Sequence, residues 1–174
     1  NMSIANRVID LSNVSSDTAT LTQTGSQYTI ASSDPFGVVT FESVTFAKPT
    51  ASLTIRMGGD EGVPILSRDQ LTVTNVDLSG VALTIDGQVG KDQVIFTGTN
   101  ITAALAVTAE EITIGGTLTA TTVTLTAASG GAAAGDGEIT DGAIFASAGS
   151  GLALPRASIP APGAESLRWR WAWA

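Results

Sequence analysis

The chain of 174 residues carries 8 Lys+Arg against 16 Asp+Glu, a net charge of −8, with no His and no Cys. The absence of His and Cys excludes Ser-His-Asp and Cys-His catalysis, thiolate metal sites and disulfides. At roughly 150 residues per domain, the length favours one compact domain, with or without a tail.

The acidic excess is concentrated in the main body of the chain. Arg156, Arg168 and Arg170 lie near the C-terminus, which leaves five basic against fifteen acidic residues in 1–150. Such a surface repels a phosphate backbone, so we expect no nucleic-acid partner. No segment approaches the roughly 20 apolar residues of a membrane-spanning helix, and no transmembrane segment is expected.

Short strands are predicted along most of residues 1–127. The chain has 24 threonines but only 5% aromatic residues, and β-branched side chains favour strands. Apolar residues alternate with Thr, Asp or Asn, which is typical of strands with one buried face. The alternation is clearest in residues 71–73, 81–85 and 122–126.

An approximate repeat of thirty residues links these strands. Residues 41–46 recur at 73–78, 32 positions later, and residues 53–55 recur at 83–85, 30 positions later. Turns containing Gly and acidic residues follow 53–55 and 83–85. The full set of anchors, with steps of 32, 30 and 29, is Leu21, Leu53, Leu83 and Ile112. A fixed period of this size indicates a repeat architecture.

The fold predicted for 1–127 is all-β, a short parallel β-helix or β-solenoid with coils of about thirty residues. The alternative is an antiparallel β-sandwich or jelly-roll fibre subunit, in which the period is incidental. Residues 101–111 are rich in Ala and could form one short helix. Thr102, Val107 and Thr108 are poor helix formers, and they favour a strand there.

Residues 128–166 are rich in Gly, Ala and Pro and form a predicted linker or capping segment. Ile139, Ala143, Ile144 and Phe145 could supply one further strand in its middle.

The last predicted segment, 167–174, alternates bulky and basic residues and reads as an extended strand. Its three tryptophans are spaced by two and share one face of that strand. The candidate partner-binding residues are Trp169, Trp171, Trp173, Arg168 and Arg170. They would act as a strand donated to a neighbour or as a patch for an anionic surface. The other interpretation is a terminal segment that packs on its own chain or has no function.

The acidic residues of the predicted turns are the only candidate chemical site. Carboxylates on loops can ligate calcium, a hard cation that prefers oxygen ligands, and we expect no other cofactor. The candidate ligands are Asp60, Glu61, Asp86 and Asp92. The competing interpretation is that these carboxylates accept hydrogen bonds from their own turns.

Paired carboxylates could also hydrolyse glycosidic bonds by acid and base action. The sequence places no aromatic cluster beside them to bind a sugar ring, since the chain has one Tyr and all three Trp lie in the tail. We therefore expect a protein that is not an enzyme.

Residues 71–87 and 112–127 carry a resemblance to a known class of proteins. They resemble repeat regions of large secreted bacterial exoproteins, the filamentous-haemagglutinin-like adhesins and related giant surface proteins, in their Thr, Gly and Ala content and alternating strands. The resemblance covers roughly 7–127 and implies a right-handed parallel β-helix, secretion and a role in adhesion or surface architecture. The short length and the Trp/Arg terminus depart from that class.

The expected function is that of a non-catalytic, extracellular structural or adhesive protein presenting a rigid β-scaffold at a cell surface. Its expected partners are further copies of itself or a cell-surface glycan. The alternative is a self-assembling fibre or virion subunit completed by strand donation, and a minor one is a carbohydrate-active enzyme. Exposed threonines also suit contact with ice or mineral, but in the sequence their spacing is too irregular to favour it.

Overall fold

The computed structural model describes residues 4–11, 18–32, 41–58, 69–88, 92–127, 143–146 and 152–153. In these ranges the regular structure consists of strands, as predicted, and no helix long and apolar enough to cross a membrane occurs. The strands are β1 (Asn6–Asp10), β2 (Thr18–Thr24), β3 (Gln27–Ser32), β4 (Val44–Ala47), β5 (Ser52–Arg56), β6 (Asp69–Thr74), β7 (Asp77–Asp86), β8 (Asp92–Thr97), β9 (Thr99–Ala109), β10 (Glu111–Ile114), β11 (Thr117–Thr119), β12 (Thr122–Ala127), β13 (Ala143–Ala146) and β14 (Leu152–Ala153). Residues 101–111, for which a helix was the alternative, lie almost entirely in β9 and β10.

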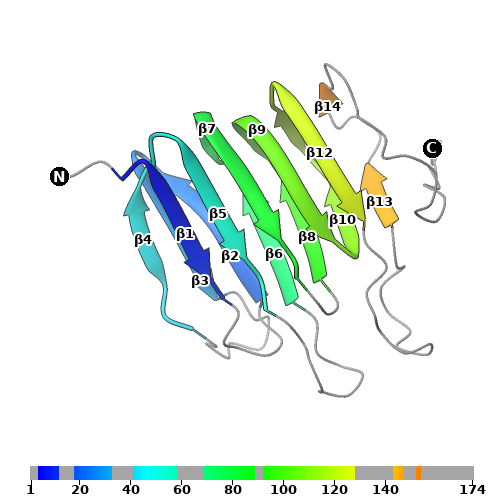
Figure 1. The fold of residues 1–174 in the computed structure, drawn as a ribbon, viewed down its shortest axis with the longest axis horizontal. Coiled ribbons are helices and arrows are strands. Elements are labelled where there is room, and N and C mark those ends of the chain that lie inside the picture. The colour runs from blue at the N-terminus through cyan, green and yellow to red at the C-terminus, as the bar shows by residue number, and fades with distance from the viewer. Residues whose placement is uncertain are drawn as a thin grey trace.

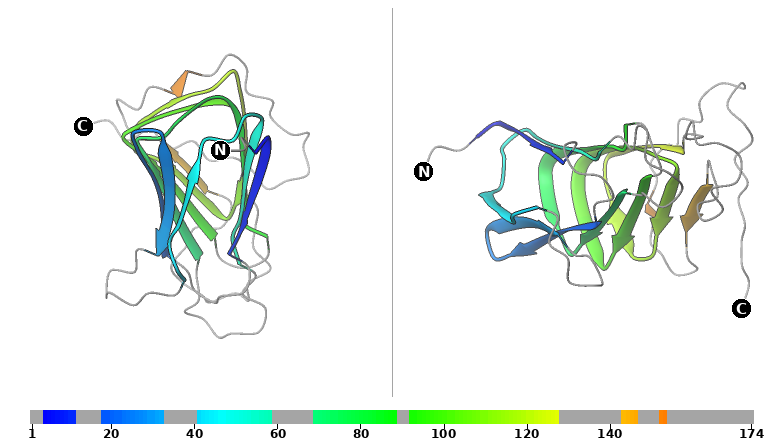
Figure 2. Two further views of the ribbon diagram at one scale, coloured as in Figure 1. Left: turned by 90° about the vertical axis from the view of Figure 1, so that its left-hand side faces the viewer. Right: turned by 90° about the horizontal axis from the view of Figure 1, so that it is seen from below.

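The strands form two sheets that lie opposite each other (Figures 1 and 2). Sheet A has the order β1-β5-β7-β9-β11-β14, with β12 also paired to β9, and its described pairings are all parallel. Sheet B has the order β13-β10-β8-β6-β2-β3-β4 and is mixed, since β3 is antiparallel to both of its neighbours. From β5 to β10 the chain passes alternately from one sheet to the other, and the core lies between them.

Rows of like side chains cross sheet A from strand to strand. Leu53 pairs with Leu83, and Leu83 pairs with Leu105, while Ile55 and Ile85 form the next inner row. All five side chains are at most 3% exposed, because alternate residues of a strand point to the same face. Residues 53–55 and 83–85 are therefore neighbours on adjacent parallel strands, which confirms that part of the predicted repeat.

The regular period of thirty residues is wrong. Leu21 pairs with Val73 and Ile112 pairs with Val94, all in sheet B, so neither Leu21 nor Ile112 is equivalent to Leu53 or Leu83. Along sheet A the pairings Ser52↔Ala82, Ala82↔Ala104 and Ala104↔Thr122 give steps of 30, 22 and 18 residues. The strands stay in register while the connections between them shorten, since longer loops cost little additional free energy.

The match between residues 41–46 and 73–78 is also wrong. Phe46 lies in β4, which pairs antiparallel with β3, whereas Leu78 lies in β7, which pairs parallel with β9. The β2–β3 connection is a two-residue hairpin with Gly25 at its first position and a φ of 61° there. Glycine favours this left-handed conformation, and it turns the chain back on itself instead of sending it to sheet A.

The turns that lead from sheet B to sheet A share a left-handed backbone. Asn75 has a φ of 52° and Gly98 a φ of 65° at corresponding turns after β6 and β8. Asn100 is 3% exposed, accepts a hydrogen bond from the Val76 N–H at 3.2 Å and donates to the Thr97 carbonyl at 2.8 Å. The buried amide therefore holds two successive turns together.

The strand expected within 128–166 is confirmed in part, because Ala143–Ala146 forms β13 and pairs with β10. The segment 167–174 with its Trp and Arg residues lies outside the described residues. The expected division of the chain at 127 and 166 stays a prediction.

Candidate functional site

The four carboxylates predicted to bind calcium do not all lie in the described part of the chain. Asp60 and Glu61 are outside it, while Asp86 ends β7 and Asp92 begins β8. Asp86 Oδ1 accepts a hydrogen bond from the N–H of Gln88 at 3.1 Å, and Gln88 has a φ of 66°. Asp86 therefore stabilises its own turn, as the competing interpretation of these residues predicts.

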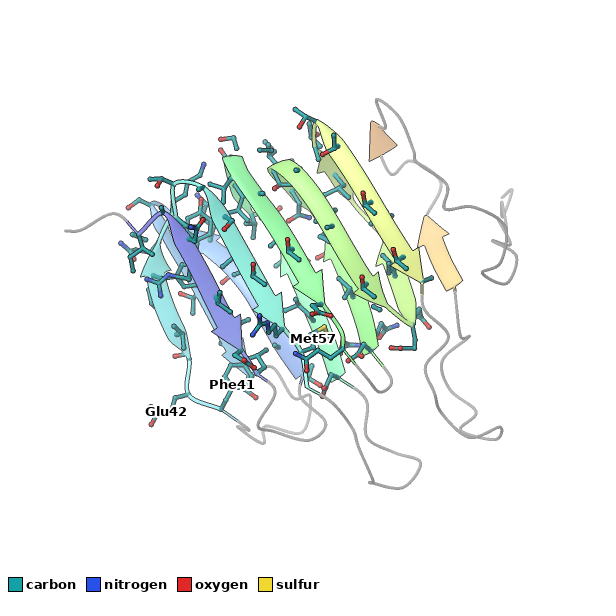
Figure 3. The ribbon with its side chains drawn as sticks, in the orientation of Figure 1. Phe41, Glu42 and Met57 are labelled. Carbon is teal, nitrogen blue, oxygen red and sulfur yellow. The ribbon has the colours of Figure 1, made fainter. Side chains whose placement is uncertain are left out.

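Asp92 belongs to a group of three buried carboxylates that the structure brings together. Asp69 is 1% exposed, Asp92 is 0% exposed and Glu110 is 2% exposed. Asp69 and Asp92 are paired across β6 and β8, and the pairing of Gln93 with Glu111 places Glu110 at the equivalent position before β10. They lie at the corner where the chain leaves sheet A and enters sheet B. Met57 lies past the end of β5 and is labelled in Figure 3.

These carboxylates accept hydrogen bonds from the backbone of the turns. Asp69 Oδ2 accepts from the Gly58 N–H at 2.9 Å, and Glu110 Oε2 accepts from the Asp92 N–H at 2.6 Å. The Glu110 N–H in turn donates to the Asp92 carbonyl at 3.1 Å. Because buried backbone donors need acceptors, the carboxylates complete the hydrogen bonding of a corner where the sheet pattern is interrupted.

Gly87 explains how closely the turn after β7 packs on this corner. A Cβ on Gly87 would lie 2.9 Å from Asp92 Oδ2 and 2.9 Å from the Thr108 carbonyl oxygen, to which the Gly87 N–H donates at 2.8 Å. Only glycine fits there, and the corner is closed over Asp92 by backbone.

The described residues at this corner offer no room for a ligand. In the ranges that the structure describes, no three His, Cys, Asp or Glu side chains are grouped as a metal site. The recess beside Asp69 is lined mainly by Leu11, Ala19, Met57 and Leu71 and does not admit a water molecule. Calcium binding by Asp60 and Glu61 stays a prediction.

A row of amides follows the outer face of sheet B beside the buried carboxylates. Gln70 Nε2 donates to Gln93 Oε1, and Gln93 Nε2 donates to Glu111 Oε1. The row connects β6, β8 and β10, and it strengthens the same parallel register that places Asp69 next to Asp92.

A second polar group joins the β2–β3–β4 meander to the turn between β6 and β7. The Asp77 N–H donates to Gln23 Oε1 at 2.7 Å, the Tyr28 hydroxyl donates to the Asp77 carbonyl, and Lys48 Nζ lies 3.7 Å from Asp77 Oδ1. The hydrogen bond from the Ser79 N–H, at 2.8 Å, is the main cause that lowers the pKa of the Asp77 carboxyl. Burial, with a smaller contribution from the Asp77 charge, raises the pKa of Tyr28.

Arg7 is the one cation of the described residues that reaches between the sheets. Its guanidinium carbon lies 5.0 Å from the centre of the Phe46 ring, which stacks on Tyr28 at 5.8 Å. Its Nε is buried and has no hydrogen-bond acceptor. The aromatic face compensates part of the cost of burying the charge.

Sequence reasoning named Asp92 and Asp86 but missed the part that Glu110 plays at the corner. The signal was the distance of 18 residues from Asp92 to Glu110, which equals the step from Gln93 to Glu111 and from Ala104 to Thr122. No protein family, curated protein or solved structure matches this chain significantly.

Proposed function

We propose that sheets A and B are two walls of a short β-solenoid, and that the protein is a non-catalytic structural or adhesive scaffold displayed outside the cell. The observation that supports this proposal is the row Leu53–Leu83–Leu105, which continues in register to Val123 across four parallel strands. Equivalent residues stacked over one another are the defining feature of repeat architectures.

A scaffold of this kind gains rigidity from its core rows. Each fully buried Leu, Ile or Val contributes about 1.5–3 kcal/mol relative to an exposed one. The inner rows of sheet A face those of sheet B, including Leu71, Val94 and Ile112, all of which are 0% exposed. Because the same rows pass through several strands, no single strand can move without disturbing its neighbours.

The buried carboxylates also favour a structural role. Asp69 and Glu110 accept hydrogen bonds from backbone N–H groups, and the corner around them admits no water. A glycosidase needs two carboxyl groups that flank a bound sugar, several ångströms apart and open to it. The described carboxylates of this corner lack that access.

Location can be tested on intact cells of the organism that makes the protein. Antibodies raised against the purified chain should label unpermeabilised cells, and brief protease treatment of whole cells should remove the label. A cytoplasmic protein serves as the control and should be labelled after lysis alone. Labelling of the chain that requires lysis would contradict an extracellular scaffold.

Catalysis can be tested separately on a panel of neutral and acidic glycans. We expect no depolymerisation by the purified chain. Turnover that Asp92→Asn abolishes, in a variant that keeps its strand spectrum by circular dichroism, would instead establish the carbohydrate-active enzyme.

The second candidate function is a fibre subunit completed by strand donation. It is favoured by the edges of the two sheets, since among the described strands β1 pairs with β5 alone and β4 pairs with β3 alone. An exposed edge presents unpaired backbone groups to a further strand. Deleting 167–174 should abolish polymers and leave a folded monomer if the Trp/Arg segment is the donated strand, whereas unchanged assembly would contradict donation.

A further inference from the structure

The outer face of sheet B carries two regular rows of threonines that the sequence does not reveal. The first row is Thr45–Thr29–Thr22–Thr74–Thr97, formed by consecutive pairings across β4, β3, β2, β6 and β8. The second row is Ala31–Thr20–Thr72–Ile95–Thr113, across β3, β2, β6, β8 and β10. We call the eight threonines of these rows the threonine face. The strands that carry it lie side by side in Figure 1.

The two rows are regular in both directions of the sheet. Neighbouring strands are about 4.8 Å apart, and alternate residues of one strand are about 6.6 Å apart. Thr20 and Thr22, and likewise Thr72 and Thr74, are alternate residues, so each of these strands gives one threonine to each row. The sequence hid this order because the rows join residues from 16 to 52 positions apart, as Thr29 with Thr45 and Thr22 with Thr74.

The threonine face is also rigid and chemically uniform. A β-branched side chain has restricted χ1 freedom, and in a strand it stands roughly perpendicular to the sheet. The hydroxyls of Thr29 and Thr45 lie 3.0 Å apart and form a hydrogen bond that links two strands of the first row. Each threonine therefore presents one hydroxyl and one methyl group at a fixed place.

The composition of the face excludes most partners. From β4 to β10 neither row contains a charged or an aromatic residue. Nucleic acids require basic residues, and protein partners are anchored mainly by Trp, Tyr and Arg. A mineral lattice of ions would require charged ligands such as carboxylates. The occupant that remains is an uncharged lattice with repeats in two directions.

We infer that the threonine face binds ice. The repeats of about 4.8 Å and about 6.6 Å approximate repeats of oxygen atoms on faces of hexagonal ice. The hydroxyls can hydrogen-bond to water molecules of that lattice, while the methyl groups order the water between the rows. Little conformational entropy is lost on binding, since the side chains are already fixed.

The opposite sheet provides a matched control. Thr84 lies on the outer face of sheet A between Thr54 and Ala106, and it is half-buried like Thr74. Thr74→Tyr and Thr84→Tyr introduce the same bulky residue, which strands accept well, on opposite faces of the molecule. Circular dichroism and the midpoint of urea unfolding identify any variant that fails to fold, and Thr22→Tyr then replaces Thr74→Tyr.

The experiment measures the growth of ice crystals during annealing of a frozen solution of the full chain. We expect the native chain and Thr84→Tyr to arrest recrystallisation, and Thr74→Tyr to require a concentration about tenfold higher. A native chain that acts no better than an equal mass of serum albumin would overturn the inference. Equal activity of the two variants would overturn it as well. Either failure leaves the proposed scaffold function untouched, because that function does not depend on the threonine face.

Discussion

Gly116 packs directly against Gly98 in the turn below it, and the two backbones are in contact. The Thr117 N–H donates to the Gly98 carbonyl at 2.7 Å. A Cβ on Gly116 would lie 2.1 Å from that carbonyl oxygen and 2.6 Å from the Gly98 nitrogen. Both neighbours are backbone atoms, which cannot rotate away as a side chain can.

Gly116→Ala should therefore destabilise the protein by about 1–3 kcal/mol, the usual cost of forcing extra atoms into a packed region. The measurement is the free energy of unfolding from urea titration. Gly115→Ala is the matched control, since its Cβ would meet only the Phe96 carbonyl oxygen at 3.6 Å, an ordinary contact. Equal stabilities of the two variants would show that the turns are not stacked in this way.

Tyr28→Phe should lower the free energy of unfolding by about 0.5–1.5 kcal/mol. The substitution keeps the ring that stacks on Phe46 and removes only the hydrogen bond to the Asp77 carbonyl, which ties β3 to the start of β7. The comparison is Thr45→Val, which removes an exposed hydrogen bond to Thr29 and should cost less. If Tyr28→Phe is as stable as the native chain, the meander is held by packing alone.

Asp77 should make the stability depend on pH in the acid range. Hydrogen bonds from Ser79, assisted by Lys48, lower the pKa of Asp77, so the folded state prefers its ionised form. The contribution is present above the ordinary value of about 3.9 and is lost as the pH falls through the lower value of the folded state.

The advantage of the native chain over Asp77→Ala should therefore shrink on acidification. Its size at neutral pH should stay below about 1 kcal/mol, because the Asp77–Lys48 pair is largely exposed. The control is Glu42→Ala, since Glu42 is exposed (Figure 3). A difference between the native chain and Asp77→Ala that persists unchanged in acid would contradict this origin.

The strands were predictable because their signal is local. The alternation Leu53-Thr54-Ile55 depends only on which face of a strand is buried, and its recurrence at 83–85 gave the correct register between β5 and β7. The hairpin at Gly25-Ser26 also had a local signal, a glycine before a serine between two alternating segments, which the search for a thirty-residue period concealed.

The order of the strands was less predictable, because it depends on connections of unequal length. Ile112 resembles Leu83 in its surroundings but follows a shorter step, and so it lies in the other sheet. The buried corner required the same information: Asp69 and Glu110 are 41 positions apart and become neighbours of Asp92 through two different steps, 23 and 18 residues. A fixed period cannot bring these three carboxylates together.

Arg7→Met should leave the protein about as stable or make it more stable, by up to about 1 kcal/mol. The substitution removes the interaction of the guanidinium with Phe46, worth about 0.5–1 kcal/mol at a partly exposed site. It also removes a buried Nε without an acceptor, which costs about 1–3 kcal/mol in the native chain. The cost of the buried Nε exceeds the gain from the ring and decides the sign, and the unbranched Met side chain keeps the packing of the arginine stem. Arg56→Met serves as the comparison, since Arg56 is exposed, lies 3.8 Å from Asp10 and should change the stability by less than about 0.5 kcal/mol in either direction. Urea unfolding of both variants measures the difference, and a loss of more than about 1 kcal/mol for Arg7→Met would mean that the contact with Phe46 outweighs the cost of burying the charge.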